Sequence, residues 1–348
     1  GIDYAHKSGK KVNVTCNTIP HEDELKRLPE FLTLLNDLGA DAIIASDLGT
    51  MGLIKKYAPS CELHASVQSG TCNSETAKAL YDFGAKRIVL ARELSFDEIE
   101  RIRESVPETL ELECFVHGAM CISYSGRCLL SNYFTQNRDS NRGQCVQCCR
   151  FKYNVMEEKR PGQYFPVVED ERGTYIFNSK DLCLLPYIPD LYQAGLSSLK
   201  IEGRMKSVHY VATVVKVYRQ ALDAYEKDPQ HFHVLPEWVA ELEKISHRPY
   251  TRGFSVSRPT EADQVYSHSS NTQTHEFIGL VKSYDTDQHI AWIEQRNYFK
   301  LGQEVEFLQP KGALVRQTIQ RIVDDKGQDL DAARHPQQLV GIYMDTPL

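Results

Sequence analysis

Short apolar runs alternate with amphipathic stretches from the start of the chain to about residue 226. This alternation predicts successive βα units, which build a parallel sheet covered by helices. Strands are expected at residues 12–17, 42–46, 62–68, 87–93, 111–117 and 197–204. Helices are expected at residues 22–38, 48–57, 74–83, 95–105, 180–194 and 207–226. The sequence therefore predicts an α/β fold.

Four of the predicted strands, at 12–17, 62–68, 111–117 and 197–204, have an apolar and a polar face. The polar faces carry Asn13, Thr15, Asn17, His64, Ser66, Gln68, Glu113, His117, Lys200, Glu202 and Arg204. Strands of a doubly wound sheet are buried on both faces and are almost continuously apolar. In a TIM-like β/α barrel the strands lead to an active site at one mouth, where polar residues gather. The pattern favours a barrel, with an open or incomplete sheet as the alternative.

The domain organisation follows from the strand count and from changes in composition. Closed barrels have about eight strands, so six strands predict a TIM-like β/α barrel that lacks its first two βα units. We assign residues 1–230 to this barrel, including a Cys-rich insertion at 118–178 that is too long for an ordinary βα loop. Prolines and a polar stretch predict a linker at 231–275, and alternating short strands predict a small β-barrel domain at 276–348.

Composition restricts the classes of function. No apolar run reaches the length of a membrane span, and no signal segment opens the chain, so we expect a cytoplasmic protein that does not bind a membrane. The formal net charge of -7 argues against general DNA binding. Residues 120–160 nevertheless carry seven Lys and Arg against three acids. One basic surface on an acidic protein suits a specific polyanionic substrate. The oligomeric state does not follow from the sequence.

Four cysteines lie close together after the strand at 111–117. Cys121, Cys128, Cys145 and Cys149 follow the spacing C-x6-C-x16-C-x3-C. In a reduced compartment such thiols bind zinc or an iron-sulfur cluster. The spacing is too uneven for two zinc knuckles and favours a cluster, with zinc and metal-free thiols as the alternatives.

Other cysteines bear on the ligand set. Cys148 and Cys183 are possible substitutes for one of the four. Cys16, Cys61, Cys72 and Cys114 share no spacing and are expected to be core thiols.

The same segment carries a family resemblance. Residues 113–131 contain E-x-F-x2-G-A-M-C-x4-G-x-C-x-L-S, followed by SNRGQCVQCCR at 140–150 and SLKIEGRMKS at 198–207. These motifs resemble the peptidase U32 family, also called collagenase-like proteases, and in particular its branch that hydroxylates tRNA. The resemblance extends over essentially the whole chain.

The resemblance implies a 4Fe-4S cluster, prephenate as co-substrate and tRNA as partner. The implied reaction converts the wobble uridine of tRNA to 5-hydroxyuridine. The implied cluster ligands are Cys121, Cys128, Cys145 and Cys149. In related members of the family a cysteine near the position of Cys183 is used, which leaves the fourth ligand open between Cys149 and Cys183.

Candidate site residues come from the polar strand faces and the insertion. We expect catalytic roles for Glu113, His117 and Arg204. Arg204 and Lys200 suit a small dicarboxylate such as prephenate. Substrate-binding roles are expected for Asn17, His64, Gln68, Arg150, Lys200 and Glu202. The alternative for the mouth residues is a network of ion pairs that only shapes the barrel.

Aromatic residues of the insertion are expected either to stack an extruded base or to form a small core of their own. These residues are Tyr124, Tyr133, Phe134, Phe151 and Tyr153.

Two other classes of function compete with an RNA-modifying enzyme. A peptidase would need a nucleophile and a base, and neither H-E-x-x-H nor G-x-S-x-G is present. The remaining protease hypothesis is a dyad of Cys121 and His117, which leaves three cysteines without a role. The other class is a non-enzymatic RNA-binding scaffold that uses the C-terminal β domain.

Overall fold

The computed structural model divides the chain into two compact units. It describes residues 1–121, 123–124, 128–135, 138–150, 154–156, 164–166, 179–259 and 272–348, without the side chains of 150, 154–156 and 164–166. Residues 1–203, 221–233 and 247–271 belong to the first unit, and residues 204–220, 234–246 and 272–348 to the second.

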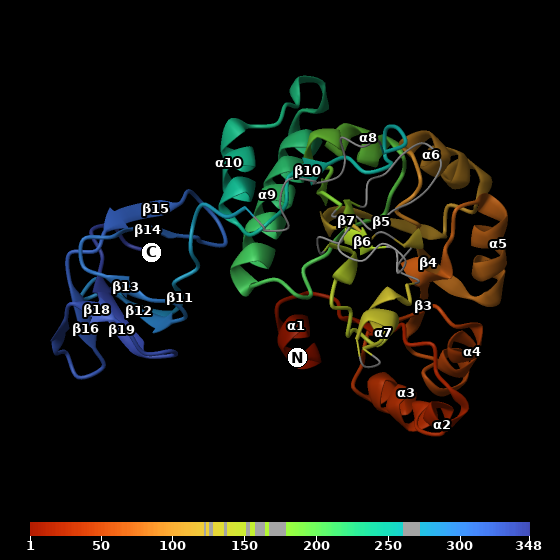
Figure 1. Cartoon of the computed structure of the whole chain (residues 1–348), viewed down its shortest axis with the longest axis horizontal. Helices are drawn as coiled ribbons and strands as arrows, with labels where there is room; N and C mark the ends of the chain where they lie inside the picture. Colours follow the sequence, from red (N-terminus) through yellow and green to blue (C-terminus); the bar gives the residue numbers. More distant parts are fainter. Residues whose placement is uncertain are drawn as a thin grey trace. The chain divides into compact units, whose positions relative to one another are not determined.

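A mainly parallel sheet forms the centre of the first unit (Figure 1). Its strands are β1 (Asn13–Cys16), β2 (Ala42–Ala45), β3 (Glu62–Ala65), β4 (Ala85–Val89), β5 (Glu111–Ala119), β8 (Asp181–Cys183), β9 (Ser198–Ile201) and β10 (Tyr250–Thr251). Strands β1 to β5 pair in the order of the sequence, and β9 runs parallel to β5. The expected α/β fold with a parallel sheet is confirmed, whereas closure into a barrel stays a prediction.

Helices follow the strands, as the alternation predicts. They are α1 (Ile2–Lys7), α2 (Glu22–Leu25), α3 (Leu28–Asp37), α4 (Leu48–Tyr57), α5 (Ser74–Phe83), α6 (Phe96–Ser105), α7 (Leu130–Phe134), α8 (Ile188–Gln193), α9 (Val208–Lys227) and α10 (Pro236–Lys244). Side chains cap several of them: Asp47 accepts from the backbone of Thr50, and Ser95 with Glu98 forms the capping box of α6. None of the helices in the described part of the chain is long and apolar enough to cross a membrane.

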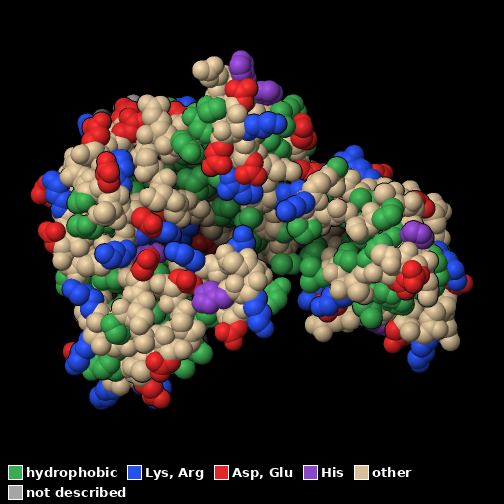
Figure 2. Space-filling view, turned by 180° about the vertical axis from the view of Figure 1, so that it is seen from behind, with side chains coloured by type: hydrophobic (Ala, Val, Ile, Leu, Met, Phe, Trp, Pro, Cys, Tyr) green, Lys and Arg blue, Asp and Glu red, His purple; other side chains and the backbone are tan. Residues whose placement is uncertain are grey.

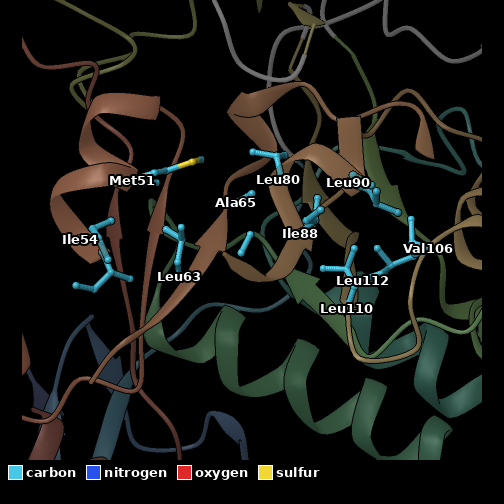
Figure 3. Packing of buried hydrophobic residues seen from close by; sticks show 14 of the residues in the cluster. Met51, Ile54, Leu63, Ala65, Leu80, Ile88, Leu90, Val106, Leu110 and Leu112 are labelled. Atoms are coloured by element: carbon cyan, nitrogen blue, oxygen red, sulfur yellow. The ribbon is translucent and has the colours of Figure 1, made fainter. Parts of the chain in front are cut away.

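The core of the first unit lies between the sheet and helices α3 to α6. Ala45, Ala65, Ile88 and Leu112 are register partners on successive strands, and all four are buried in one hydrophobic cluster (Figure 3). Side chains alternate between the two faces of a strand, so the next residues along each strand point to the opposite face. The predicted faces of His64, Leu112 and Glu113 are therefore confirmed, whereas β2 is apolar and buried on both faces.

The largest differences from the sequence-based expectation lie in two segments. The helix expected at 180–194 begins only at Ile188, because Asp181–Cys183 forms β8 on the end of β5. Residues 231–275, expected to be a linker, contain α10 and β10. Pro236 lies in the first turn of α10, where proline favours a helix start rather than a loop, and Trp238 and Leu242 are buried.

The C-terminal part of the second unit is antiparallel. One sheet has the order β11-β12-β19-β16-β17, and β13-β18 and β14-β15 form two smaller sheets. The strands are β11 (Gly279–Asp285), β12 (Ile290–Gln295), β13 (Phe299–Lys300), β14 (Glu304–Phe307), β15 (Val315–Thr318), β16 (Ile322–Asp324), β17 (Asp329–Leu330), β18 (Ala332–Ala333) and β19 (Leu339–Tyr343). They enclose a core that includes Phe299, Ile322 and Ile342. The expected C-terminal β domain is confirmed.

Short elements complete the chain. Within the predicted insertion, β6 (Asn154–Met156) and β7 (Tyr164–Pro166) pair antiparallel. The 3-10 helices are η1 (Val67–Ser69), η3 (Cys148–Arg150), η4 (Leu185–Tyr187) and η5 (Pro229–His231).

Gly118 allows β5 to approach the chain that leaves β9. Its φ is +112°, and a Cβ at this position would lie 2.5 Å from the carbonyl oxygen of Glu202. The backbone N–H of Glu202 donates to the carbonyl of His117 over 2.9 Å. A side chain at residue 118 would therefore separate the two segments.

Gly118→Ala is expected to destabilise the chain by about 3 kcal/mol or more, because backbone strain and a steric clash add together. Gly39→Ala is the matched control, since Gly39 has a φ of +72° but open space around its Cβ position. The control should cost only about 1–2 kcal/mol. Chemical unfolding followed by circular dichroism measures both, and equal losses would contradict the clash.

Candidate functional site

A chain of ion pairs crosses the polar face of the sheet. Arg87 of β4 binds Glu111 through Nε at 2.7 Å and Glu113 through Nη1 at 3.1 Å. Lys200 of β9 donates from Nζ to Oε1 of Glu113 over 2.9 Å. Both oxygens of Glu113 are thus occupied by cations from the two neighbouring strands.

Glu113 is held in its ionised form. Burial alone would raise the pKa of this carboxyl, but Lys200 and Arg87 outweigh the burial and lower the pKa. The side chain is only 7% exposed. A carboxylate with a lowered pKa and two ion-pair partners is a weak proton acceptor, so the geometry gives Glu113 a positioning role.

Two cations lie over the ring of Phe115 on the polar face of the sheet. The guanidinium carbon of Arg92 lies 3.8 Å from the ring centroid, and Nζ of Lys200 lies 5.5 Å from it. Arg92 follows the carboxyl end of β4, and its charge interacts with those of Cys121 and Glu202. The sequence analysis missed Arg92. A cation near the carboxyl end of a predicted parallel strand was the available signal, because active sites gather at the carboxyl ends of such strands.

Three of the four predicted thiol ligands lie in one neighbourhood. Cys121 and Cys145 are exposed and Cys128 is half-buried. Desolvation by the surrounding chain raises the pKa of Cys121, and the charges of Cys128 and Cys145 raise it further, while Arg92 acts in the opposite direction. Cys121 thus lies near enough to Cys128 and Cys145, which come from separate parts of the insertion, for their charges to act on it.

Backbone N–H groups point at two of these sulfurs. Leu130 donates to Sγ of Cys128 over 3.3 Å, and Gln147 donates to Sγ of Cys145 over 3.4 Å. Hydrogen bonds to cysteine sulfur are one means by which proteins tune iron-sulfur clusters. Within the described residues no three Cys, His, Asp or Glu side chains converge on a point that would hold a single ion. The donor set fits a cluster held by separate thiolates, and Cys149 is half-buried beside the buried Cys148.

Asn141 fastens the segment between Cys128 and Cys145, called here the cysteine segment, to the sheet. Its Nδ2 donates to the carbonyl of Asn17 and to Oε1 of Gln68, each over 3.0 Å, and its Oδ1 accepts from the backbone of Ile19 over 2.8 Å. Two residues predicted to bind substrate, Asn17 and Gln68, are thereby brought together. Sequence reasoning missed Asn141, because only tertiary structure shows which loop asparagine reaches the sheet.

The predicted histidines are both buried. His64 is 2% exposed and contacts Oε2 of Glu62 over 3.1 Å, and burial lowers its pKa. His117 is 1% exposed, and its ring centroid lies 5.3 Å from that of Tyr250. In the antiparallel pairing of β5 with β8, His117 is the register partner of Cys183. These imidazoles belong to the floor of the site rather than to its surface.

The remaining predicted residues have different positions. Glu202 follows β9 in the first unit, whereas Arg204 belongs to the second unit, so its predicted role stays a prediction. Tyr124, Tyr133 and Phe134 are at least half exposed; they do not form a small core. Phe151, Tyr153 and the side chain of Arg150 lie outside the described residues.

Both parts of the chain match models of known protein families. Residues 1–265 match the model of peptidase family U32, and residues 273–348 match that of the peptidase family U32 C-terminal domain.

Several characterised relatives are similar over most of the chain. The tRNA hydroxylation protein P1 of Bacillus subtilis is 41% identical over 345 residues, which cover 99% of this chain and 81% of the relative. The tRNA hydroxylation protein P of Escherichia coli is 36% identical, covering 96% of this chain and 81% of the relative. The 23S rRNA 5-hydroxycytidine C2501 synthase of Escherichia coli is 38% identical, covering 74% of this chain and 38% of the relative. With both domain models matched in order along its length, the chain belongs to peptidase family U32.

Proposed function

We propose that the chain is an iron-sulfur enzyme that hydroxylates the wobble uridine of tRNA to 5-hydroxyuridine, with prephenate as co-substrate. The observation that carries this proposal is the gathering of Cys121, Cys128 and Cys145 beside Arg92, after the carboxyl ends of β4 and β5. The names of the relatives from two bacteria support RNA hydroxylation. A tRNA substrate implies a cytoplasmic enzyme.

Cys121, Cys128, Cys145 and Cys149 would hold the cluster, which supplies electron-transfer chemistry when bound. The chain's own residues have separate tasks around it. Asn141 holds the cysteine segment against the sheet. Glu113 fixes the ammonium group of Lys200 under the site. The exposed rings of Tyr124, Tyr133 and Phe134 offer stacking surfaces for an unpaired base.

The peptidase alternative requires Cys121 and His117 to act as a nucleophile and its base. His117 is almost completely buried against Tyr250, so a peptide carbonyl has little access to its ring. The burial of His117 therefore disfavours the dyad.

The scaffold alternative places RNA on the second unit. This unit has a cavity of about 1110 Å³, and its lining includes the glutamates 241, 276, 304 and 306 but only the lysines 244 and 311. Lys244 already binds Glu241 and Glu306 over 2.6 and 2.5 Å. An acidic cavity does not attract phosphates, so the second unit gives no support to an RNA-binding scaffold of this kind.

Expression of the chain in a bacterial strain that lacks its own tRNA uridine hydroxylases is expected to restore 5-hydroxyuridine. Mass spectrometry of tRNA nucleosides measures the product, and omission of prephenate synthesis in the host should abolish it. Unmodified tRNA in the presence of an iron-loaded protein would overturn the proposed reaction.

Cys145→Ser is expected to lower iron binding by at least about 10-fold, because residues that merely orient a metal ligand already contribute that much. The exposed position of Cys145 predicts little change in stability. Cys61→Ala is the matched control: Cys61 is buried in the core and should affect stability while leaving iron intact. Iron and sulfide analysis after anaerobic purification checks both variants, and full iron content in Cys145→Ser would contradict the ligand assignment.

Glu113→Gln is expected to cost about 3 kcal/mol at neutral pH, because it removes the counter-charge of the partly buried Lys200 and one of the two counter-charges of Arg87. A lowered pKa stabilises the fold above the unfolded pKa of about 4.3 and loses this contribution as the pH falls through the folded pKa. The variant should therefore lose less stability than the wild type on acidification. Glu111→Gln is the control, since the Glu111 side chain is 44% exposed and its loss should cost about 1 kcal/mol or less. Urea unfolding at neutral and acidic pH provides the measurement, and parallel acid slopes for wild type and Glu113→Gln would exclude this role.

A further inference from the structure

Arg92 differs from the other cations on the polar face of the sheet. Arg87 and Lys200 are each bound to carboxylates of β5. No carboxylate in the described part of the chain forms an ion pair with Arg92, although the charges of Cys121, Glu202 and Glu93 act on it. Among the described residues Arg92 has no ion-pair partner, so its hydrogen-bond donors are available to another molecule.

The surroundings of Arg92 make an unpaired charge costly. The guanidinium lies over the ring of Phe115, which is only 9% exposed. Burial lowers the pKa of Arg92, yet a guanidinium stays charged at all physiological pH values. A desolvated cation without a counter-ion is unfavourable, and a bound anion removes this cost.

The geometry also restricts the kind of anion. One face of the guanidinium is covered by Phe115, so its edge is available for the paired hydrogen bonds that carboxylates and phosphates accept. RNA backbone phosphates are normally bound by accessible surface cations, whereas Arg92 is strongly desolvated. A small ligand reaches such a group more readily than a polymer does.

We propose that Arg92 binds a carboxylate group of the small-molecule co-substrate beside Cys121. The carboxylate would bind to the edge of the guanidinium, which Phe115 does not cover. This assignment rests on the proposed function, in which the co-substrate is a dicarboxylate. It makes Arg92 a substrate-binding residue that the sequence motifs do not contain, and it places the ligand next to the thiols.

The test compares wild type, Arg92→Gln and Arg92→Lys, all purified anaerobically as full chains. Calorimetric titration with prephenate should show affinity reduced by about 10-fold or more in Arg92→Gln, the usual effect of losing a charge-assisted hydrogen bond. Arg92→Lys should recover only part of the affinity, because an ammonium group cannot bind bidentately. Arg101→Gln is the matched control, since Arg101 is exposed on α6 and should bind prephenate as the wild type does.

Iron content and tRNA affinity are measured on the same samples. Unchanged iron and unchanged tRNA binding in Arg92→Gln support the inference. Loss of iron would instead make Arg92 a support for the cluster, and selective loss of tRNA binding would make it a phosphate contact; either result overturns the inference.

The inference and the proposed function fail separately. The inference is overturned if Arg92→Gln binds prephenate as tightly as the wild type does, or if the wild type binds no prephenate. Either result overturns it even if uridine hydroxylation occurs. If Arg92→Gln loses prephenate affinity but the wild type produces no hydroxylated uridine, the carboxylate site is supported and the proposed reaction is contradicted.

Discussion

The buried carboxylate of Glu113 joins three strands of the sheet on their polar face. Arg87 reaches it from β4 and Lys200 from β9, while Glu113 itself lies on β5. On the opposite face, Leu112 is fully buried in the hydrophobic core. A one-residue shift of β5 would exchange these faces, because side chains alternate along a strand. The core and the ion pairs therefore fix the same register, and every site residue on β5 depends on it.

In this register, the residues that support the site are distinct from the residues that could bind ligands. Glu113 has both oxygens occupied by cations, so it shapes the floor of the site. Above that floor, Arg92 and the thiols follow the ends of β4 and β5, and Asn141 fastens the cysteine segment to the ends of β1 and β3. Parallel strands bring their carboxyl ends to one edge of a sheet, so loops that are distant in sequence converge there. Residues at that edge remain available to ligands because the charged residues beneath them form ion pairs with one another.

The faces of the strands were predictable from sequence because a period of two is a local property. The polar position of His64 and the apolar position of Leu112 follow from this period alone. The pairing of Glu113 with Arg87 was not predictable, since it depends on which strands become neighbours. Likewise, Pro236 suggested a linker, although it lies in the first turn of a helix. The cysteine spacing indicated a metal centre, but the positions of Arg92 and Asn141 beside it required the fold.

One cation that the sequence count assigned to the basic segment 120–160 is already paired within the fold. Arg142, one of the cations in the segment 120–160, binds Glu24 through Nη2 at 2.8 Å and lies 3.6 Å from Asp139. On the face shown in Figure 2, acidic and basic side chains are interspersed rather than separated into patches. A cation that is already paired releases no counter-ion when nucleic acid binds, so it adds little to general phosphate attraction. For an acidic chain of this kind, selection of an RNA would have to depend on stacking and on shape more than on net charge.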